Sequence, residues 1–394
     1  MKILFCSSNC LLDPSSGAAI SVRTLLQMLS KEGATTAAFT SACFDRAISD
    51  VPSTELETIG FMQEPAADAN AVWHANSENV DHYAVPFDTT RRGRLTKENE
   101  MELLERALVF IDEFQPDVVL SYGAGVFEQR LRQTLQERSI PTVFYLANPN
   151  YKKMGSFQYA DKIFTDTQAT GDLYRERGLE SFTIGKFVNR PNVSSDETRQ
   201  NYVTFVNPSP EKGVTLFYRI LQLAQEVVPR AKFLVVESRG SLDIAEARAG
   251  IPFSSYKSVT RLGLQKDMSE VFSMTKVLLM PSVWHESGAR TAIEACSVGV
   301  PTIATDHGGV PEILGDGGIL IAPPPPLLEN HWIIPPLTAA IPWVEAIDAL
   351  LNDKETYRLH SEAALERWSH HEPSVRVGVV LDQLQELIQA VKDK

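Results

Sequence analysis

Two glutamates in the second half of the chain are the first candidates for chemistry. Glu286 and Glu294 are separated by seven residues, in a segment that reads PSVWHESGARTAIEACSVGVPTIATDHGGVPEILGDGG over residues 281–318. On one helix they would lie roughly 80° apart around the axis and about 12 Å apart along it. A glycosidase pair needs its carboxylates about 5–10 Å apart. The spacing therefore favours a long ligand whose separate parts are each held by one carboxylate.

The residues around these glutamates suit a phosphate group. A helix is expected to begin at residues 288–291, and the free amides and dipole of a helix start attract anions. Arg290 gains nothing from that dipole, so both a phosphate contact and a surface ion pair are open to it. Gly308 and Gly309 follow the next predicted strand, and Pro311 suits the first turn of another helix. Two such strand–loop–helix turns predict a cradle for a diphosphate.

Short apolar runs alternate with amphipathic stretches along the whole chain. Strands are predicted over residues 2–6, 117–121, 141–146, 162–165, 202–207, 232–237, 277–281 and 301–305. Helices are predicted around residues 19–29, 101–114 and 214–228. This alternation is typical of a parallel sheet covered by helices on both faces. Residues 322–336 contain six prolines, which predicts irregular structure there.

These motifs resemble the retaining GT-B glycosyltransferases of the sucrose-synthase and lipopolysaccharide type, known as glycosyltransferase family 4 or group 1. The family hallmark is Glu, seven residues, Glu, and then Gly-Gly-x-Pro-Glu, which matches Glu286, Glu294 and residues 308–312. Residues 207–213, NPSPEKG, resemble the Lys-Gly loop that opens the second domain in the family. The resemblance spans nearly the whole chain and is stronger in its second half.

The resemblance implies a role for each matching residue. Lys212 would neutralise the leaving diphosphate and Glu286 would hold hydroxyls of the donor sugar, which makes these two the catalytic candidates. Glu294 would hold the ribose hydroxyls, and Gly17 would let the first-domain loop approach the diphosphate. The implied donor-binding set is Gly17, Lys212, Glu286, Gly288, Ala289, Arg290, Thr291, Glu294, Gly308 and Gly309. Neither a metal nor another cofactor is expected, because cationic side chains and helix ends can neutralise the diphosphate.

The sequence departs from the family pattern at three places. The usual Glu-x-Phe-Gly is replaced by Glu286 followed by Ser-Gly-Ala. The arginine that often precedes the Lys-Gly pair is missing, and either Arg239 or Arg261 is open as its substitute. The histidine that often lines the acceptor side is also missing, which leaves Asn148 or Tyr151 as the acceptor-side candidates.

The fold that the resemblance implies is α/β of the GT-B type, with two Rossmann-like, doubly wound parallel-sheet domains facing across a cleft. The first, acceptor-side domain is expected over residues 1–190 and a linker over 191–201. The nucleotide-sugar domain is expected over 202–370. Residues 371–394 are predicted to form a helix, whose apolar stripe needs a surface to cover, and the resemblance implies that this helix crosses back to the first domain.

Composition narrows the class of partner. The chain has 394 residues, of which 43% are hydrophobic and 22% charged, and a net charge of −13. This balance argues against nucleic acid as a partner. No apolar run reaches the ~20 residues that span a bilayer, and the four cysteines are too few for a disulfide framework. We expect a cytoplasmic protein, with peripheral contact to the inner membrane face left open and its oligomeric state undetermined.

The function expected from this resemblance is transfer of a sugar with retention. The donor would be a UDP-, GDP- or ADP-sugar, and the acceptor hydroxyl would belong to a glycan, a lipid-linked molecule or a small molecule. The product would carry an α-glycosidic bond, formed without a metal. Two alternatives are a nucleotide-sugar epimerase on the same fold and a non-catalytic scaffold that binds nucleotide sugars. A nicotinamide dehydrogenase is disfavoured because no Gly-x-Gly-x-x-Gly follows the first strand.

Overall fold

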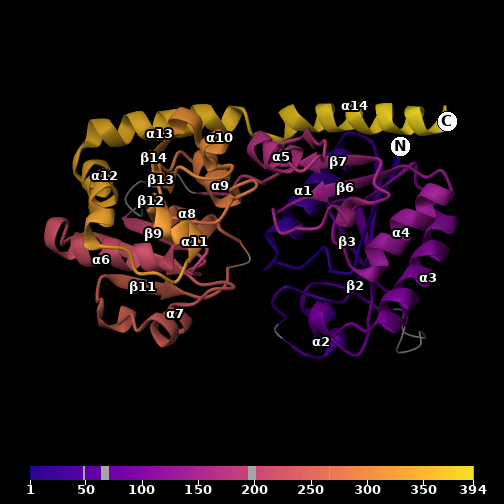
Figure 1. The fold of residues 1–394 in the computed structure, drawn as a ribbon, viewed down its shortest axis with the longest axis horizontal. Helices are drawn as coiled ribbons and strands as arrows, with labels where there is room; N and C mark the ends of the chain where they lie inside the picture. Colours follow the sequence, from indigo (N-terminus) through magenta and orange to yellow (C-terminus); the bar gives the residue numbers. More distant parts are fainter. Residues whose placement is uncertain (48, 64–70, 194–200, 266, 394) are drawn as a thin grey trace. The chain divides into compact units, whose positions relative to one another are not determined.

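The chain folds into two compact α/β units, shown in Figure 1 as a computed structural model that describes residues 1–47, 49–63, 71–193, 201–265 and 267–393. One unit comprises Met1–Phe187 together with Pro373–Lys394, and the other comprises Val188–Glu372. Most of the predicted linker, residues 194–200, lies outside the described residues. The two units are described separately below.

The first unit is built on a sheet whose described strands run in the order β3-β4-β2-β1-β5-β6-β7-β8. Every neighbouring pair is parallel except β3 and β4, which are antiparallel. The strands are β1 Lys2–Ser7, β2 Thr35–Ser41, β3 Trp73–Ser77, β4 Val80–Val85, β5 Val118–Ser121, β6 Thr142–Leu146, β7 Lys162–Thr165 and β8 Phe182–Thr183. The helices are α1 Gly17–Lys31, α2 Pro52–Thr58, α3 Lys97–Phe114, α4 Val126–Glu137, α5 Gln168–Arg175 and α14 Pro373–Lys392, with short 3₁₀ turns η1 Arg92–Arg94 and η2 Met154–Phe157.

Alternating side chains of this sheet pack under different helices. Ile3 and Phe5 of β1 join the apolar cluster that also contains residues of α1 and α14, whereas Leu4 and Cys6 join the cluster that contains residues of α3 and α4. Successive strand side chains point to opposite faces, so the continuous apolar run in β1 requires cover on both sides. This is the reason why the predicted strand is apolar throughout.

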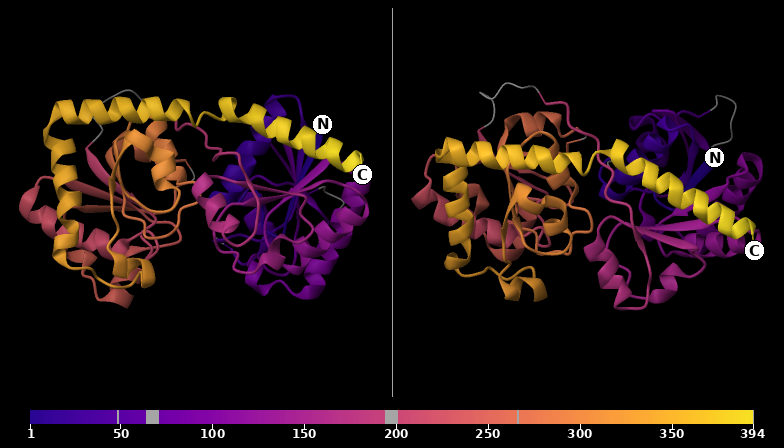
Figure 2. Two further views of the ribbon diagram at one scale, coloured as in Figure 1. Left: turned by 45° about the horizontal axis from the view of Figure 1, so that its top comes forward. Right: turned by 90° about the horizontal axis from the view of Figure 1, so that it is seen from above.

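Helix α14 belongs to the first unit although it ends the chain. Val377, Val380, Leu384 and Leu387 are buried in one cluster with residues of β1 and α1, and Leu381, Ile388 and Val391 pack against that cluster. Both views of Figure 2 show this helix, in yellow, running along the side of the first unit. The apolar stripe noted in the sequence therefore covers the sheet of the first unit.

The second unit has a fully parallel sheet, whose described strands run in the order β11-β10-β9-β12-β13-β14. These strands are β9 Tyr202–Val206, β10 Lys232–Val236, β11 Val259–Leu262, β12 Thr275–Met280, β13 Thr302–Thr305 and β14 Gly318–Ile321. The helices are α6 Val214–Val227, α7 Leu242–Ala249, α8 Ser269–Met274, α9 Arg290–Ser297, α10 Val310–Leu314, α11 Pro325–Glu329, α12 Ile341–Asn352 and α13 Lys354–Ser369, with 3₁₀ turns η4 Phe253–Ser255, η5 Gly315–Gly317 and η6 Leu337–Ala340.

The second sheet is also covered on both faces. Val277 and Leu279 of β12 pack in the cluster that holds residues of α6 and α12, whereas Leu278 and Met280 pack in the cluster that holds residues of α9 and α13. The predicted α/β fold with two doubly wound domains is confirmed. The ends of the predicted strands agree with the structure to within two residues.

One local prediction was wrong. Residues 322–336 were expected to be irregular, but α11 forms there over Pro325–Glu329. Pro325 and Pro326 occupy the first helical positions, where the missing N–H has no helical partner in any case. A run of prolines can therefore begin a helix, although it cannot continue one. Elsewhere, no helix in the described ranges is long and apolar enough to cross a membrane.

The packing of α14 can be tested with two adjacent valines. Val380 is 0% exposed and Val379 is 46% exposed. Val380→Ala removes two buried methyl groups and should lower the free energy of unfolding by roughly 1–3 kcal/mol. The matched control Val379→Ala should change it by less than about 0.5 kcal/mol. Urea unfolding of the full chain measures both; equal effects would contradict the assigned face of α14.

Candidate functional site

The strand order of the second sheet reverses beside β9. Strands β10 and β11 lie on one side of β9, and β12, β13 and β14 lie on the other. In open α/β sheets, ligands bind outside the carboxyl ends of the strands at such a reversal point. The loops that leave β9 and β12 there, residues 207–213 and 281–289, contain Lys212, Glu286, Gly288 and Ala289, and the second loop leads into α9.

Lys212 and Glu286 meet at this point although they are 74 positions apart in the chain. The Lys212 ammonium pairs with Oε1 of Glu286, and the Ser282 hydroxyl donates to the same oxygen at 2.6 Å. The two charged side chains are 27% and 10% exposed. The site thus holds a partly buried cation beside a nearly buried carboxylate, both within reach of a ligand from solvent.

Backbone contacts hold the two loops together. The amides of Val283 and Trp284 donate to the Glu211 carbonyl at 3.0 and 3.1 Å. Gly213 has a φ of 81°, and a Cβ there would collide with the Pro281 carbonyl oxygen. Glycine is needed at position 213 for both reasons. The position of Lys212 is therefore fixed by the neighbouring glycine.

The paired glycines lie against the other side of the Glu286 loop. The Gly309 amide donates to the Glu286 carbonyl at 2.7 Å. Gly308 has a φ of 62°, and a Cβ there would lie 2.8 Å from the Glu286 nitrogen and 2.9 Å from the Cα of His285. The loop after β13 thus packs against the backbone of Glu286. This close packing requires glycine at position 308.

Helix α9 begins with an unusual backbone conformation. Its N-cap residue, Ala289, has φ 36° and ψ 50°, a left-handed conformation that costs energy for a residue with a Cβ. Within the described ranges, no side chain caps this helix start by accepting a hydrogen bond. The amides of Arg290 and Thr291 in the first turn, with Gly288 beside them, form the kind of helix end that binds anions.

Glu294 lies inside α9 and pairs with Arg290. The Arg290 Nη1 contacts Oε1 of Glu294 at 2.9 Å, and the Glu294 side chain is only 6% exposed. Its other oxygen, Oε2, is buried and has no hydrogen-bond partner among the described residues. Burial raises the pKa of Glu294, and the positive charge of Arg290 opposes that rise. Of the two roles left open for Arg290, the ion pair is present.

Aromatic and imidazole rings surround Glu286. The rings of His285 and His307 lie 6.1 Å apart, and those of Trp284 and His331 lie 6.3 Å apart, both pairs nearly perpendicular. Burial lowers the pKa of both His285 and His307, which favours neutral imidazoles. Neutral imidazole can donate one hydrogen bond and accept another, so these side chains suit the hydroxyl groups of a sugar.

Two supporting residues were missed by the sequence analysis. Ser282 donates to Glu286 and Asn207 accepts from the Gly240 amide at 2.8 Å through Oδ1. Asn207 also has a φ of 61°, which asparagine tolerates better than most residues. Ser282 could have been suspected from its place directly after a buried strand. Nothing in the sequence pattern indicates the contact of Asn207.

The proposed substitutes for the missing arginine differ in their surroundings. Arg261 bonds Glu237 at 2.7 Å and Asp243 at 2.8 Å, so its guanidinium is already held by two carboxylates. Arg239 is exposed in the loop after β10. In the described ranges, no cluster of three or more His, Cys, Asp or Glu side chains is arranged to hold a metal ion.

The remaining candidates lie in the first unit. Gly17 is the first residue of α1, and a Cβ there would meet no described atom within 4 Å. Tyr151 accepts from the Gly123 amide at 3.0 Å, and burial raises its pKa to about 12. Asn148 accepts from the Asn150 amide at 3.1 Å, within its own turn. Tyr151 therefore holds a neighbouring loop in place, and the acceptor-side role of both residues stays a prediction.

The fold is shared with solved structures of other proteins. Sucrose-phosphate synthase from Thermosynechococcus elongatus superposes with a TM-score of 0.69 at 16% identity, over 99% of both chains. HepE from Anabaena, solved in complex with UDP-glucose, superposes with a TM-score of 0.64 at 15% identity, over 99% of this chain and 100% of that chain. Similarity at these levels of identity establishes the fold.

Sequence comparison finds a family match for the second unit and one curated relative for part of the chain. Spore coat protein SA from Bacillus subtilis (strain 168) is 30% identical over 90 residues, which cover 23% of this chain and 21% of that protein. The match thus spans about one fifth of this curated relative. Residues 189–367 match the family described as glycosyl transferases group 1, and they include Lys212, Glu286 and Glu294. The second unit is thus similar in sequence to the group 1 glycosyltransferases, and both units share a GT-B fold with the solved structures.

Proposed function

We propose that this protein transfers a sugar from a nucleotide-diphosphate donor to an acceptor hydroxyl, with retention of configuration and without a metal. The observation that carries the proposal is the contact between Lys212 and Glu286 at the reversal point of the second sheet. A cation and a carboxylate side by side match the two ends of the bond that must break. One end becomes a diphosphate, and the other is a sugar rich in hydroxyls.

Lys212 suits the leaving group. Breaking the bond between the sugar and the diphosphate places growing negative charge on the phosphate oxygens, and a fixed cation stabilises that charge most in the transition state. The first amides of α9 would add donors to the same diphosphate. Together they would supply the neutralisation that a magnesium ion supplies in other transferases.

Glu294 suits the ribose of the donor. Its Oε2 is buried without a partner among the described residues, and a buried acceptor in that state is stabilised by a hydroxyl that donates to it. Glu294 lies four residues after the first residue of α9, which is about 6 Å along the helix axis. Glu286 would then hold hydroxyls of the transferred sugar.

The groups around Glu286 argue against a covalent intermediate on this carboxylate. The Glu286 carboxylate is occupied by Lys212 and Ser282, which makes it a poor nucleophile toward the sugar. We therefore propose attack by the acceptor on the face that the diphosphate leaves, with a phosphate oxygen accepting the proton of the acceptor. A bound small-molecule or glycan hydroxyl would serve as the acceptor.

Removing Lys212 should slow the reaction. Lys212→Ala removes a charge-assisted contact worth roughly 1.5–3 kcal/mol, so turnover should fall by about tenfold or more. The control Lys232→Ala alters an exposed lysine at the amino end of β10, on the opposite edge of the sheet. Steady-state kinetics, with thermal unfolding to confirm the fold, measure both. Near-normal turnover in a folded Lys212→Ala variant would place the active site elsewhere.

Glu294 can be tested with paired nucleotides. Whichever nucleoside diphosphate stabilises the protein best in a thermal screen is compared with its 2′-deoxy form. The natural protein should prefer the ribonucleotide by about tenfold, since a hydrogen bond to a carboxylate is lost with the hydroxyl. Glu294→Gln should reduce this preference, whereas Glu226→Gln, at an exposed position of α6, should leave it intact. An unchanged preference in Glu294→Gln would refute the ribose assignment.

The reaction itself is read from its product. The protein is incubated with an α-linked nucleotide sugar and a panel of acceptors in the presence of EDTA, and proton NMR gives the configuration of the new bond. We expect an α-linked product at the rate seen without EDTA. A β-linked product would overturn retention, and a rate restored only by Mg²⁺ or Mn²⁺ would overturn metal independence. A changed donor without acceptor would indicate an epimerase instead.

A further inference from the structure

The first unit contains a pocket of about 510 Å³ at the carboxyl ends of three neighbouring strands. Its polar lining comes from Asn9 after β1, from Asp45 and Arg46 after β2, and from Arg91 and Arg92 after β4. We call it the arginine pocket. The loops after β2 and β4 are joined by a hydrogen bond from the Phe44 amide to the Thr90 carbonyl at 2.9 Å. The pocket therefore has a wall of paired backbone.

The charge of this pocket is opposite to that of the chain. Three arginines and one aspartate line it, in a protein whose net charge is −13. Arg91 contacts Asp50 at 3.0 Å, but the two side chains are 57% and 63% exposed. An exposed ion pair of this kind contributes little to the stability of the fold. Arg91 can therefore exchange Asp50 for an anionic ligand at a small cost in free energy.

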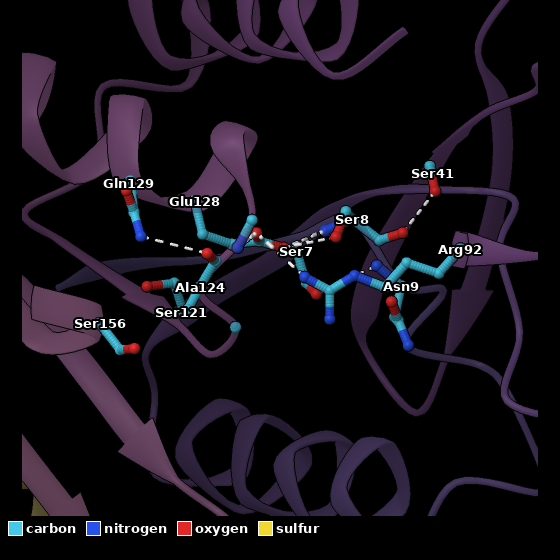
Figure 3. A network of polar contacts seen from close by, with 12 residues as sticks. Ser7, Ser8, Asn9, Ser41, Arg92, Ser121, Ala124, Glu128, Gln129 and Ser156 are labelled. Carbon is cyan, nitrogen blue, oxygen red and sulfur yellow. Dashed lines mark hydrogen bonds and ion pairs between the residues drawn. The ribbon is translucent and has the colours of Figure 1, made fainter. Parts of the chain in front are cut away.

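Arg92 is held in the pocket by a buried carboxylate. Its Nη2 contacts Oε2 of Glu128 at 3.2 Å, and the Glu128 side chain is 0% exposed. The Ser8 amide and hydroxyl donate to Oε1 of Glu128 at 2.9 and 2.5 Å, and the Gly125 amide donates to Oε2 at 2.9 Å. Figure 3 shows the Arg92 guanidinium extending toward Glu128 and Ser8, with Asn9 beside it. The carboxylate thus orients the guanidinium.

Most of the donors of Arg92 are available to a ligand. A guanidinium has five N–H donors, and within the described part of the chain Glu128 accepts the one hydrogen bond found from it. The Arg92 side chain is 37% exposed. A guanidinium with its position fixed and its remaining donors accessible is suited to binding two oxygens of a phosphate or carboxylate at once.

The position of the pocket in the fold also supports binding of a ligand there. In the first sheet the strand order reverses beside β1, since β2 lies on one side and β5 on the other. Ser8 follows β1, and Glu128 lies in α4, which follows β5. Glu128 therefore bridges the reversal point, and the arginine pocket opens next to it. This is the part of an open α/β sheet where ligands bind.

We propose that the arginine pocket binds the phosphate or carboxylate group of the acceptor, a small sugar or polyol that carries such a group. The arginines hold the anionic group, and Asp45 accepts hydrogen bonds from hydroxyls of the same molecule. This assignment of the acceptor rests on the proposed function, whereas binding of the anionic group does not. The acceptor is thereby narrowed to a charged small molecule.

The test is direct binding to the full chain. Backbone amide NMR follows titration with inorganic phosphate, and calorimetry compares glucose 6-phosphate and glucuronate with glucose. We expect saturable shifts at Asn9, Arg46 and Gly93, and at least tenfold tighter binding of one of the two anionic sugars than of glucose. Tighter binding of glucose 6-phosphate assigns the group as a phosphate, and tighter binding of glucuronate assigns it as a carboxylate.

Variants separate this pocket from other anion sites. Arg46→Gln combined with Arg91→Gln should remove the preference for the anionic sugar, whereas Arg94→Gln, an exposed arginine of the same turn outside the lining, should keep it. Arg92 is left in place, because its loss would remove the ion pair of the buried Glu128. Shifts confined to residues 209–213 and 286–309, equal binding of all three sugars, or an unchanged preference in the double variant would each overturn the proposal.

A nucleotide titration distinguishes failure here from failure of the proposed function. If nucleoside diphosphates bind the natural protein and the anionic sugars do not, the arginine pocket is wrong and the transferase assignment stands. If the anionic sugars bind and no nucleotide does, the anion site stands and its assignment to an acceptor falls with the proposed function.

Discussion

The contact between the loops after β9 and β12 is the constraint on which the rest of the second unit depends. Two parallel strands end side by side at the point where the sheet reverses its order, and their loops must pack without a side chain between them. Gly213 makes this possible, because any Cβ there would collide with the Pro281 carbonyl. Lys212 and Glu286 are neighbours as a consequence.

The same constraint explains the strained and small residues around the site. Gly308 supports the Glu286 backbone from the loop after β13, and Ala289 adopts a left-handed conformation at the start of α9. The conformation of Ala289 costs energy that ordinary packing would not require. The resulting arrangement places four fixed groups at one edge of the sheet: the Lys212 ammonium, the Glu286 and Glu294 carboxylates, and the start of α9. Such groups stabilise developing charge without having to reorganise during the reaction.

Much of this arrangement could be predicted from the sequence. Alternation of apolar runs and helices predicted β1, β5, β6 and β7 of the first sheet and β9, β10, β12 and β13 of the second, because a parallel strand covered on both faces must be apolar throughout, as in β1. The spacing of Glu286 and Glu294 and the two glycine-rich loops indicated the candidate site. These signals are local, because each lies within a short stretch of consecutive residues.

Other features could not be predicted because they depend on contacts distant in the chain. Glu128 reads as an ordinary polar residue of an amphipathic helix, and only the fold shows it buried under Ser8 and Arg92. Arg261 was open as a partner for phosphate, but Glu237 and Asp243 hold it. The helix at Pro325–Glu329 was missed because a run of prolines was taken as a barrier to any helix, although it is a barrier only beyond the first turn.

The most direct test of the central claim is a crystal structure with the nucleoside diphosphate that stabilises the protein best. The account predicts the diphosphate between the Lys212 ammonium and the first amides of α9, with a ribose hydroxyl on Oε2 of Glu294. A nucleotide bound at any other edge of the second sheet, or one that leaves the Lys212–Glu286 pair untouched, would contradict it.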